Sequence, residues 1–237
     1  MPLNKQSGNM YPWVTHTLTI LNGACPHECR YCYVNDLKRY PVLAEKYSGP
    51  PRLVESDFEL NLGSGNTIFV CSTHDLFADA IPDEFIGAVL GLLFDFPDNT
   101  YLLQTKNPAR FSDWSFPPNT VLGTTVESDI DYNISRAPSP MSRLAAMKRI
   151  GLDRPSIPLM LSIEPIMDFT PTILIPRIKE IMPKFVSIGA DSKGHNLPEP
   201  SSTEKVEYLI DELGAFTEVK LKANLARLGI DLNEFRK

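Results

Sequence analysis

The sequence lacks several features, and each absence narrows the classes of protein that it can encode. No run of ~18 uninterrupted apolar residues occurs, so no membrane span is expected. Residues 1–8 contain no apolar signal core, which predicts a cytoplasmic protein. Positive charge is in the minority, with a net charge of −6, and this argues against broad attraction to phosphate backbones. Neither an internal repeat nor a dividing linker is found, so residues 1–237 are expected to form one domain.

Cysteine is also scarce, but three of the four cysteines crowd into one short stretch. Cys25, Cys29 and Cys32 follow the spacing C-x3-C-x2-C. In a reducing cytosol this crowding favours a metal or cluster site over a disulfide framework. Three protein thiolates leave one iron of a [4Fe–4S] cluster open, and a catalytic metal site requires such an open position.

A structural zinc site is the alternative interpretation of the same stretch. The three cysteines with His27 or His74 would form a Cys3His set in a zinc-stabilised binding module without catalysis. Zinc motifs usually bring their cysteines in C-x2-C pairs, whereas one gap here is a residue longer. The spacing therefore favours a cluster.

Strand-like and helix-like segments alternate along most of the chain. Strands that are apolar nearly throughout are typical of a parallel sheet covered by helices. Right-handed crossovers would curl this sheet into a partial (β/α)6–7 barrel of the TIM type, with the functional loops after the strands. The expected strands are 16–21, 67–71, 100–105, 120–126, 158–163, 185–189 and 218–222, and the expected helices are 33–46, 81–94, 140–150, 172–182 and 203–213.

Three segments of the predicted domain stand out from this alternation. Residues 25–32 form the cluster loop at the end of the first strand. Residues 47–66 contain Pro, Ser and Gly and are expected to be an irregular excursion over the barrel rim. Residues 218–237 are expected to be a last strand followed by a helical tail.

The cysteine loop resembles that of the radical S-adenosylmethionine superfamily. Both have a first strand and then Cys25-x-x-x-Cys29-x-Tyr31-Cys32, with an aromatic residue before the last cysteine. In that superfamily the open iron binds S-adenosylmethionine, and one electron cleaves it to methionine and a 5′-deoxyadenosyl radical that abstracts hydrogen from a substrate. The resemblance implies a [4Fe–4S] cluster and S-adenosyl-L-methionine as cofactors, Tyr31 beside the adenine, and an electron donor such as flavodoxin or ferredoxin.

A narrower resemblance covers more of the chain. Five segments look like a phage-associated family of radical-SAM-like proteins that is distantly similar to spore photoproduct lyase; they are residues 68–77, 82–85, 102–108, 122–127 and 161–165. This resemblance implies the fold and the cofactors but does not identify the substrate, which is expected to be either a small molecule or a nucleic-acid-related compound. The superfamily's Gly-Gly-Glu after the second strand is absent, and Ser72 and Thr73 stand in its place.

The remaining candidate residues lie at strand ends. Catalytic roles toward the substrate are predicted for Lys106, Glu164 and Asp191, after the third, fifth and sixth strands. Glu164 either binds a cation or hydroxyl or pairs with a base such as Lys222. Cofactor binding is predicted for Tyr31, for Ser72, Thr73 and Asp75 after the second strand, and for Thr124, Thr125 and Glu127 after the fourth, where the superfamily commonly contacts the ribose.

Two of these residue groups have open alternatives. Asp75 is expected either to receive an amine of the methionine moiety or to cap a turn. Lys220 and Lys222 share one face of the last strand; they contact an anionic substrate if that face lines the barrel, and they block edge pairing if it does not.

Overall fold

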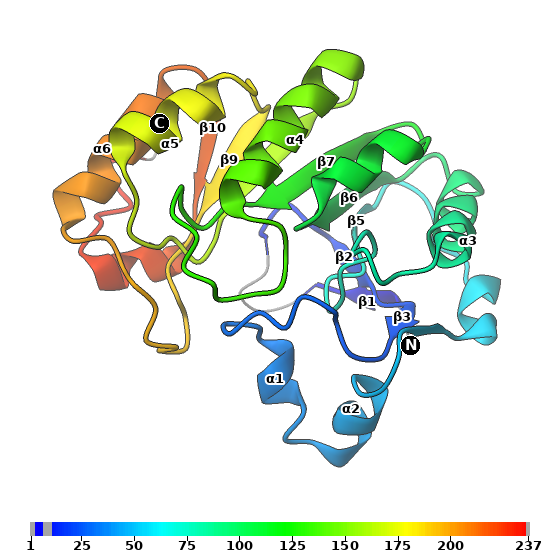
Figure 1. The fold of residues 1–237 in the computed structure, drawn as a ribbon. Helices are drawn as coiled ribbons and strands as arrows, with labels where there is room; N and C mark the ends of the chain where they lie inside the picture. The colour runs from blue at the N-terminus through cyan, green and yellow to red at the C-terminus, as the bar shows by residue number, and fades with distance from the viewer. Residues whose placement is uncertain (1–2, 7–10, 236–237) are drawn as a thin grey trace. The chain divides into compact units, whose positions relative to one another are not determined.

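A computed structural model describes residues 3–6 and 11–235. The chain divides into two compact units, the first comprising Met1–Leu122 with Ser135–Ala137 and the second Gly123–Ile134 with Pro138–Lys237. Among the described residues, the main strands of the first unit are ordered β1-β2-β5-β6, those of the second are ordered β8-β9-β10, and β7 spans the point where the chain passes from one unit to the other (Figure 1). These strands are β1 Leu3–Lys5, β2 His16–Leu18, β5 Thr67–Val70, β6 Thr100–Thr105, β7 Thr120–Thr125, β8 Leu159–Ile163, β9 Phe185–Ile188 and β10 Glu218–Leu221.

The first unit is organised by three parallel strands. β2 pairs in parallel with β5, and β5 with β6, so the loops after these strands emerge at the same edge. The short runs of β-branched and aromatic residues in β5 and β6 are buried on both faces, as expected for parallel strands. β1, which runs antiparallel to β2, was not predicted because it holds only three residues and one strongly apolar side chain.

The predicted helix 33–46 is wrong, because it is broken into two short helices. α1 covers Val34–Leu37 and α2 covers Pro41–Lys46. Tyr40 precedes a proline and adopts φ −94° and ψ 123°, since the proline ring disfavours a helical conformation for the residue before it. Pro41 then suits the first position of the new helix.

The predicted first strand, 16–21, is also divided. β2 ends at Leu18, and a separate strand β3, Leu21–Asn22, pairs antiparallel with β4, Arg52–Leu53. The expected irregular excursion 47–66 therefore contains a strand and a 3-10 helix η1, Glu55–Glu59. α3, Asp83–Phe94, lies close to its predicted position, and a 3-10 helix η2, Pro108–Asp113, follows β6.

In the second unit, β8, β9 and β10 pair in parallel, which confirms the seventh predicted strand. α4, Pro140–Asp153, begins at Ser139, whose hydroxyl accepts a hydrogen bond from the Ser142 N–H. α5, Pro171–Lys179, and α6, Thr203–Gly214, pack side by side (Figure 1). The tail forms a 3-10 helix η3, Ala223–Leu228, rather than a longer helix, and the last two residues of the predicted tail lie outside the described range.

Among residues 3–6 and 11–235, no helix is long and apolar enough to span a bilayer.

Candidate active site

The cysteine loop begins at Gly23, directly after β3. Gly23 has φ +99°, and a Cβ there would lie 2.3 Å from the carbonyl oxygen of Pro50, so only glycine fits. The N–H of Gly23 donates to the Lys46 carbonyl at 2.9 Å, and the N–H of Ala24 donates to the Gly49 carbonyl at 2.9 Å. The end of α2 thus fixes the point at which the loop leaves the strand.

The three cysteines of the loop differ in exposure. Cys29 is buried, whereas Cys25 and Cys32 are half-buried, and all three thiols are free of disulfide bonds. The Cys32 N–H donates to the Cys29 carbonyl at 3.0 Å, which makes the turn that separates the last two thiols.

The Cys25 thiol sits in an environment that keeps it protonated without a metal. Burial raises its pKa to about 12, and the nearby charge of Asp75 acts in the same direction. Backbone N–H groups of His27 and Asp75 point at the sulfur and oppose the shift. A metal bound at this sulfur would have to displace the proton.

Asp75, in the turn after β5, accepts hydrogen bonds from several elements. Its Oδ2 lies 2.8 Å from His27 Nε2 and 2.7 Å from the Lys106 N–H. Its Oδ1 accepts from Thr105 Oγ1 at 2.6 Å and from the Phe77 N–H at 3.0 Å. Burial alone would raise the pKa of this carboxyl, but the bonds from His27, Thr105 and Lys106 lower it to about 2.

The other predicted residues of the first unit lie around this turn. Lys106 Nζ lies 5.2 Å from the centroid of the Tyr31 ring, a cation–π distance. The Tyr33 hydroxyl, which the sequence did not single out, donates to the Ser72 carbonyl at 3.1 Å. Thr73 Oγ1 is buried and has no hydrogen-bond partner among the described residues. The structure therefore brings the cysteine loop together with the predicted residues that follow β5 and β6.

Glu127, in the second unit, is buried with a partner that the sequence did not predict. Its Oε2 lies 2.9 Å from Arg143 Nη1 of α4, and both side chains are almost fully buried. The same Arg143 nitrogen donates to the Thr125 carbonyl at 2.6 Å. Thr124 and Thr125 are themselves buried at the end of β7. Their predicted contact with a ribose stays a prediction.

Glu164, after β8, forms the ion pair that the sequence offered as one alternative. Its Oε1 lies 2.6 Å from Lys222 Nζ, and both side chains are mostly buried. A Cβ at Gly189 would meet the same oxygen at 2.8 Å, so the absence of a side chain there makes room for the carboxylate. Lys220 instead pairs with Glu218 at 2.6 Å, so the two lysines of this segment have different partners.

Asp191, after β9, holds a histidine four residues later. Its Oδ1 lies 2.6 Å from His195 Nδ1, and its Oδ2 accepts from the His195 N–H at 2.6 Å. Burial pushes the pKa of Asp191 upward, but the bonds from His195 and Lys193 outweigh it and lower the pKa. In a Ser-His-Asp triad a carboxylate orients an imidazole through its Nδ1 in the same way, and Nε2 then faces the reacting group.

Sequence reasoning missed His27 as an ion-pair partner, and it missed Arg143 and His195 altogether. The Asp-x3-His spacing of Asp191 and His195 was visible as a local signal. The pairing of Glu127 with Arg143 had no such signal, because 16 residues of loop and helix separate them.

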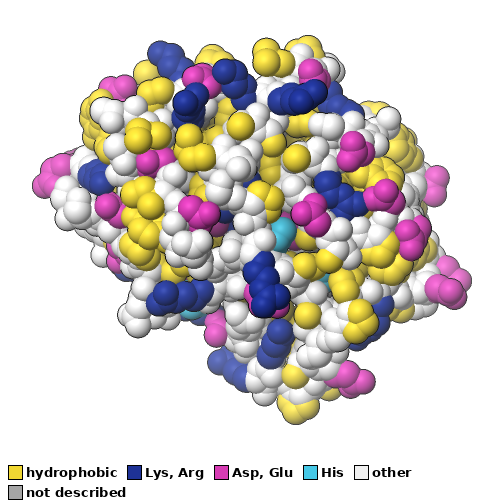
Figure 2. Space-filling model, viewed as in Figure 1, with side chains coloured by type: hydrophobic (Ala, Val, Ile, Leu, Met, Phe, Trp, Pro, Cys, Tyr) yellow, Lys and Arg dark blue, Asp and Glu magenta, His cyan; other side chains and the backbone are white. Residues whose placement is uncertain are grey.

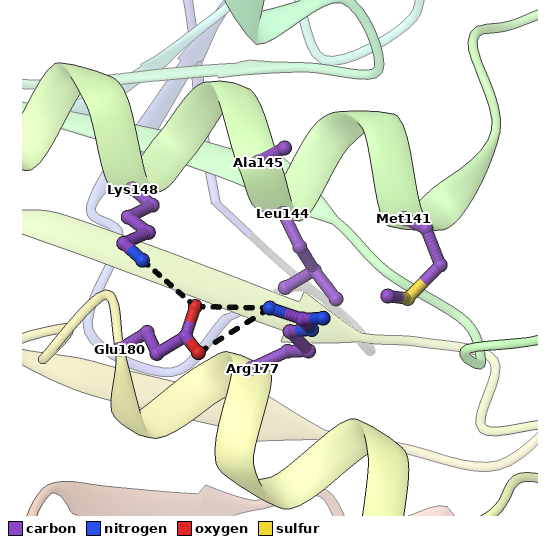
Figure 3. Close-up of a pocket in the computed structure, with 6 residues that line it drawn as sticks. All are labelled: Met141, Leu144, Ala145, Lys148, Arg177 and Glu180. Carbon is purple, nitrogen blue, oxygen red and sulfur yellow. Dashed lines mark hydrogen bonds and ion pairs between the residues drawn. The ribbon is translucent and has the colours of Figure 1, made fainter.

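A surface pocket of about 320 Å³ lies between α4 and α5, away from the predicted residues (Figure 3). Its one carboxylate, Glu180, pairs with Lys148 at 3.1 Å and with Arg177 at 3.3 Å. The Lys148 ammonium and then Arg177 lower the pKa of Glu180. The charged groups satisfy one another, and none of the lining residues bears a predicted role, so this pocket does not mark the active site.

The fold is similar to that of spore photoproduct lyase, and this confirms the predicted α/β class. A structure titled "Spore photoproduct lyase complexed with dinucleoside spore photoproduct" has a TM-score of 0.61 and 11% identity, covering 92% of this chain and 78% of the other. A mutant of that lyase with bound AdoMet and dinucleoside spore photoproduct has a TM-score of 0.53 and 12% identity, covering 98% and 66%. At such identities the likeness concerns the fold alone.

The chain belongs to the family described as "Protein of unknown function (DUF5131)", whose model matches residues 12–192. The match spans the cysteine loop and the strand ends through β9. Comparison with curated proteins gives no match.

The loop suits a cluster by its donor chemistry. No three or more His, Cys, Asp or Glu side chains of the described range are placed to hold a metal ion. Thiolates are nevertheless the ligands that iron–sulfur clusters take, and backbone N–H groups already point at the Cys25 sulfur. Thr73 Oγ1 and His74 Nδ1 are buried without a partner in the part of the chain that the structure describes, as expected beside a site that a ligand completes.

Proposed function

We propose that the chain is a radical S-adenosylmethionine enzyme whose Cys25, Cys29 and Cys32 hold a [4Fe–4S] cluster. The bound cluster would supply the electron that cleaves S-adenosylmethionine to methionine and a 5′-deoxyadenosyl radical, which takes hydrogen from the substrate. One observation carries the proposal: three thiols share one loop at the carboxyl edge of parallel strands. The fold shared with an AdoMet-bound lyase structure supports it.

The chain's own residues have distinct proposed roles around these cofactors. Tyr31 offers its ring to the adenine, with the Lys106 ammonium over the ring. Ser72 and Thr73 line the end of β5, where the unpartnered Thr73 hydroxyl can donate to a cofactor oxygen. In the second unit, Glu164 and Asp191 are proposed to act on the substrate and Glu127 to bind the cofactor, and each is held by a basic side chain of its own unit. A flavodoxin or ferredoxin is the proposed electron donor.

Zinc remains the second candidate for the same loop. His27 directs Nε2 to Asp75, and zinc-binding histidines typically have such a carboxylate partner for one ring nitrogen. A Cys3His site would then use the other nitrogen of the ring. The two candidates differ in metal, so one reconstitution experiment separates them.

We expect anaerobic reconstitution with iron and sulfide to give about four irons per chain and broad absorbance at about 400 nm. Reduction with dithionite in the presence of S-adenosylmethionine should then release methionine and 5′-deoxyadenosine, measured by chromatography. One tightly bound zinc, with no iron retained, would contradict the proposal. Iron without any 5′-deoxyadenosine would assign the cluster a different role.

The substrate that we propose is nucleic-acid related. Lys38 and Arg39 follow α1, the short helix after the cysteine loop, and the exposed Tyr40 carries the Arg39 guanidinium 4.9 Å from its ring centroid. On the face shown in Figure 2, basic side chains gather over the α1–α2 segment, although acidic and basic groups are otherwise interspersed. A cation next to an exposed ring suits a phosphate beside a stacked base. The lyase structure with a bound dinucleoside is consistent with this class.

We expect a short single-stranded oligonucleotide to bind with an affinity that falls as salt rises, measured by fluorescence anisotropy. Replacing Tyr40 by Ala should weaken binding by about 1–3 kcal/mol, because one stacking surface is lost. Tyr208 in α6 is as exposed as Tyr40, at 51%, so Tyr208→Ala is the matched control and should bind as the parent does. Absence of binding even at low salt would reject the nucleic-acid class in favour of a small molecule.

A further inference from the structure

The turn that follows β5, Ser72–Asp75, contacts the cysteine loop at four points. His74 Nε2 lies 3.0 Å from the Ala24 carbonyl oxygen, just before the first cysteine. The Asp75 N–H points at the Cys25 sulfur itself. Asp75 Oδ2 bonds His27 Nε2 at 2.8 Å, between the first and second cysteines. After the third cysteine, the Tyr33 hydroxyl donates to the Ser72 carbonyl at 3.1 Å.

These four contacts are spread along the whole loop. They precede Cys25, reach its sulfur, fall between Cys25 and Cys29, and follow Cys32. A flexible loop that must present three thiolates to one cluster loses conformational entropy when it binds. Contacts that order the loop before binding lower this entropic cost. The contacts from Ser72–Asp75 should therefore favour the uptake of metal by the loop.

Asp75 is itself fixed from the other side. Thr105 Oγ1 and the Lys106 N–H, both at the end of β6, donate to its two carboxylate oxygens at 2.6 and 2.7 Å. With His27 and the Phe77 N–H, four donors reach a carboxylate that has about four lone-pair sites. These four donors of the described residues already occupy the carboxylate, so a cofactor amine would have to displace one of them. This geometry favours positioning over the direct cofactor contact that the sequence predicted.

We propose that Ser72–Asp75 is a clamp that holds the cysteine loop in the shape that receives the cluster, and that the His27–Asp75 bond closes it. His27 and Asp75 are positioning residues, because they act on the cluster through the loop. This inference rests on the proposed function, since it assumes that the three cysteines bind iron. It assigns His27 a role distinct from that of a zinc ligand.

The loop has further anchors that do not depend on the His27 side chain. The Arg136 N–H donates to the His27 carbonyl at 2.7 Å, and the Gly23 N–H is bonded to the end of α2. Neither contact uses the imidazole. A variant at this side chain therefore tests the clamp without removing the backbone contacts of the loop.

The test compares cluster retention in reconstituted full-length variants challenged with an iron chelator. Loss of a hydrogen-bonded partner behind a metal ligand typically weakens metal binding about 10–100-fold. We expect His27→Ala to lose iron at least about 10-fold more readily than the parent, with an altered electron paramagnetic resonance signal of the reduced cluster. His27→Gln keeps a side-chain N–H for Asp75 and should recover much of the retention.

His16→Ala is the matched control, since His16 lies on β2 and its ring nitrogen Nδ1 lies 3.0 Å from the hydroxyl oxygen of its neighbour Thr15. It should retain iron like the parent. Thermal melts of the metal-free proteins check folding; if His27→Ala does not fold, His27→Leu, which fills the space but cannot donate, takes its place. Equal retention in the parent and in the variant without a donor would overturn the clamp. A parent protein that takes up no iron at all would instead overturn the proposed function.

Discussion

Replacing Cys29 by Ala is expected to abolish both iron binding and 5′-deoxyadenosine formation. Cys29 is the most buried of the three loop thiols, and two remaining thiolates cannot occupy three corners of a cluster. Iron, sulfide and absorbance at about 400 nm should fall to background after reconstitution and desalting. Product should fall below detection even with excess dithionite, because no electron reaches S-adenosylmethionine.

The fourth cysteine supplies the control for this variant. Cys71 is buried at the end of β5, and burial raises the pKa of its thiol to about 12. Backbone groups of Ile20 and Leu21 contact its sulfur, which places it outside the loop and makes it a small packing residue. Cys71→Ala should therefore load iron like the parent. If Cys71→Ala loses the cluster while Cys29→Ala keeps it, the proposed ligand set is wrong.

The alternation of strands and helices was predictable because period and composition are local properties. β5, β6, β8 and β9 each consist of a short, largely apolar run, and α6 begins at Ser202, whose side chain accepts a hydrogen bond from the Lys205 N–H. The two errors near the cysteine loop have different causes. β3 exists because Leu21 pairs with Leu53, a partner 32 residues away, so its cause is non-local. The break between α1 and α2 has a local cause, since Pro41 stands in the sequence.

The candidate site shows the same division between local and non-local information. In each unit, strand ends marked the edge at which predicted residues would be found, Asp75 in the first unit and Glu164 and Asp191 in the second, because parallel strands send their loops to one side. Their partners could not be inferred in the same way. Asp75 meets a histidine 48 residues earlier, and only the fold brings the two together. Glu164 and Lys222 are the exception, because a buried carboxylate at that position demanded a base.

Replacing Arg143 by Met is expected to have the largest effect on stability. Arg143 and Glu127 are an ion pair whose side chains are only 4% and 2% exposed. Removing the arginine leaves a buried carboxylate without its charge partner, which typically costs about 3–5 kcal/mol. It also removes the donor to the Thr125 carbonyl. Urea unfolding of the metal-free protein should show this loss as a lower midpoint at an unchanged slope.

Two variants separate the buried charge from other effects of the substitution. Arg149 lies on the same helix; its side chain is 80% exposed and pairs with Asp153 at 3.5 Å. The Arg149→Met variant should therefore change the free energy of unfolding by less than about 0.5 kcal/mol. The double variant Glu127→Gln with Arg143→Met removes both charges and should recover part of the loss, because the unpaired carboxylate is gone. A double variant no more stable than Arg143→Met would show that packing and the Thr125 bond, rather than the charge on Glu127, dominate the cost.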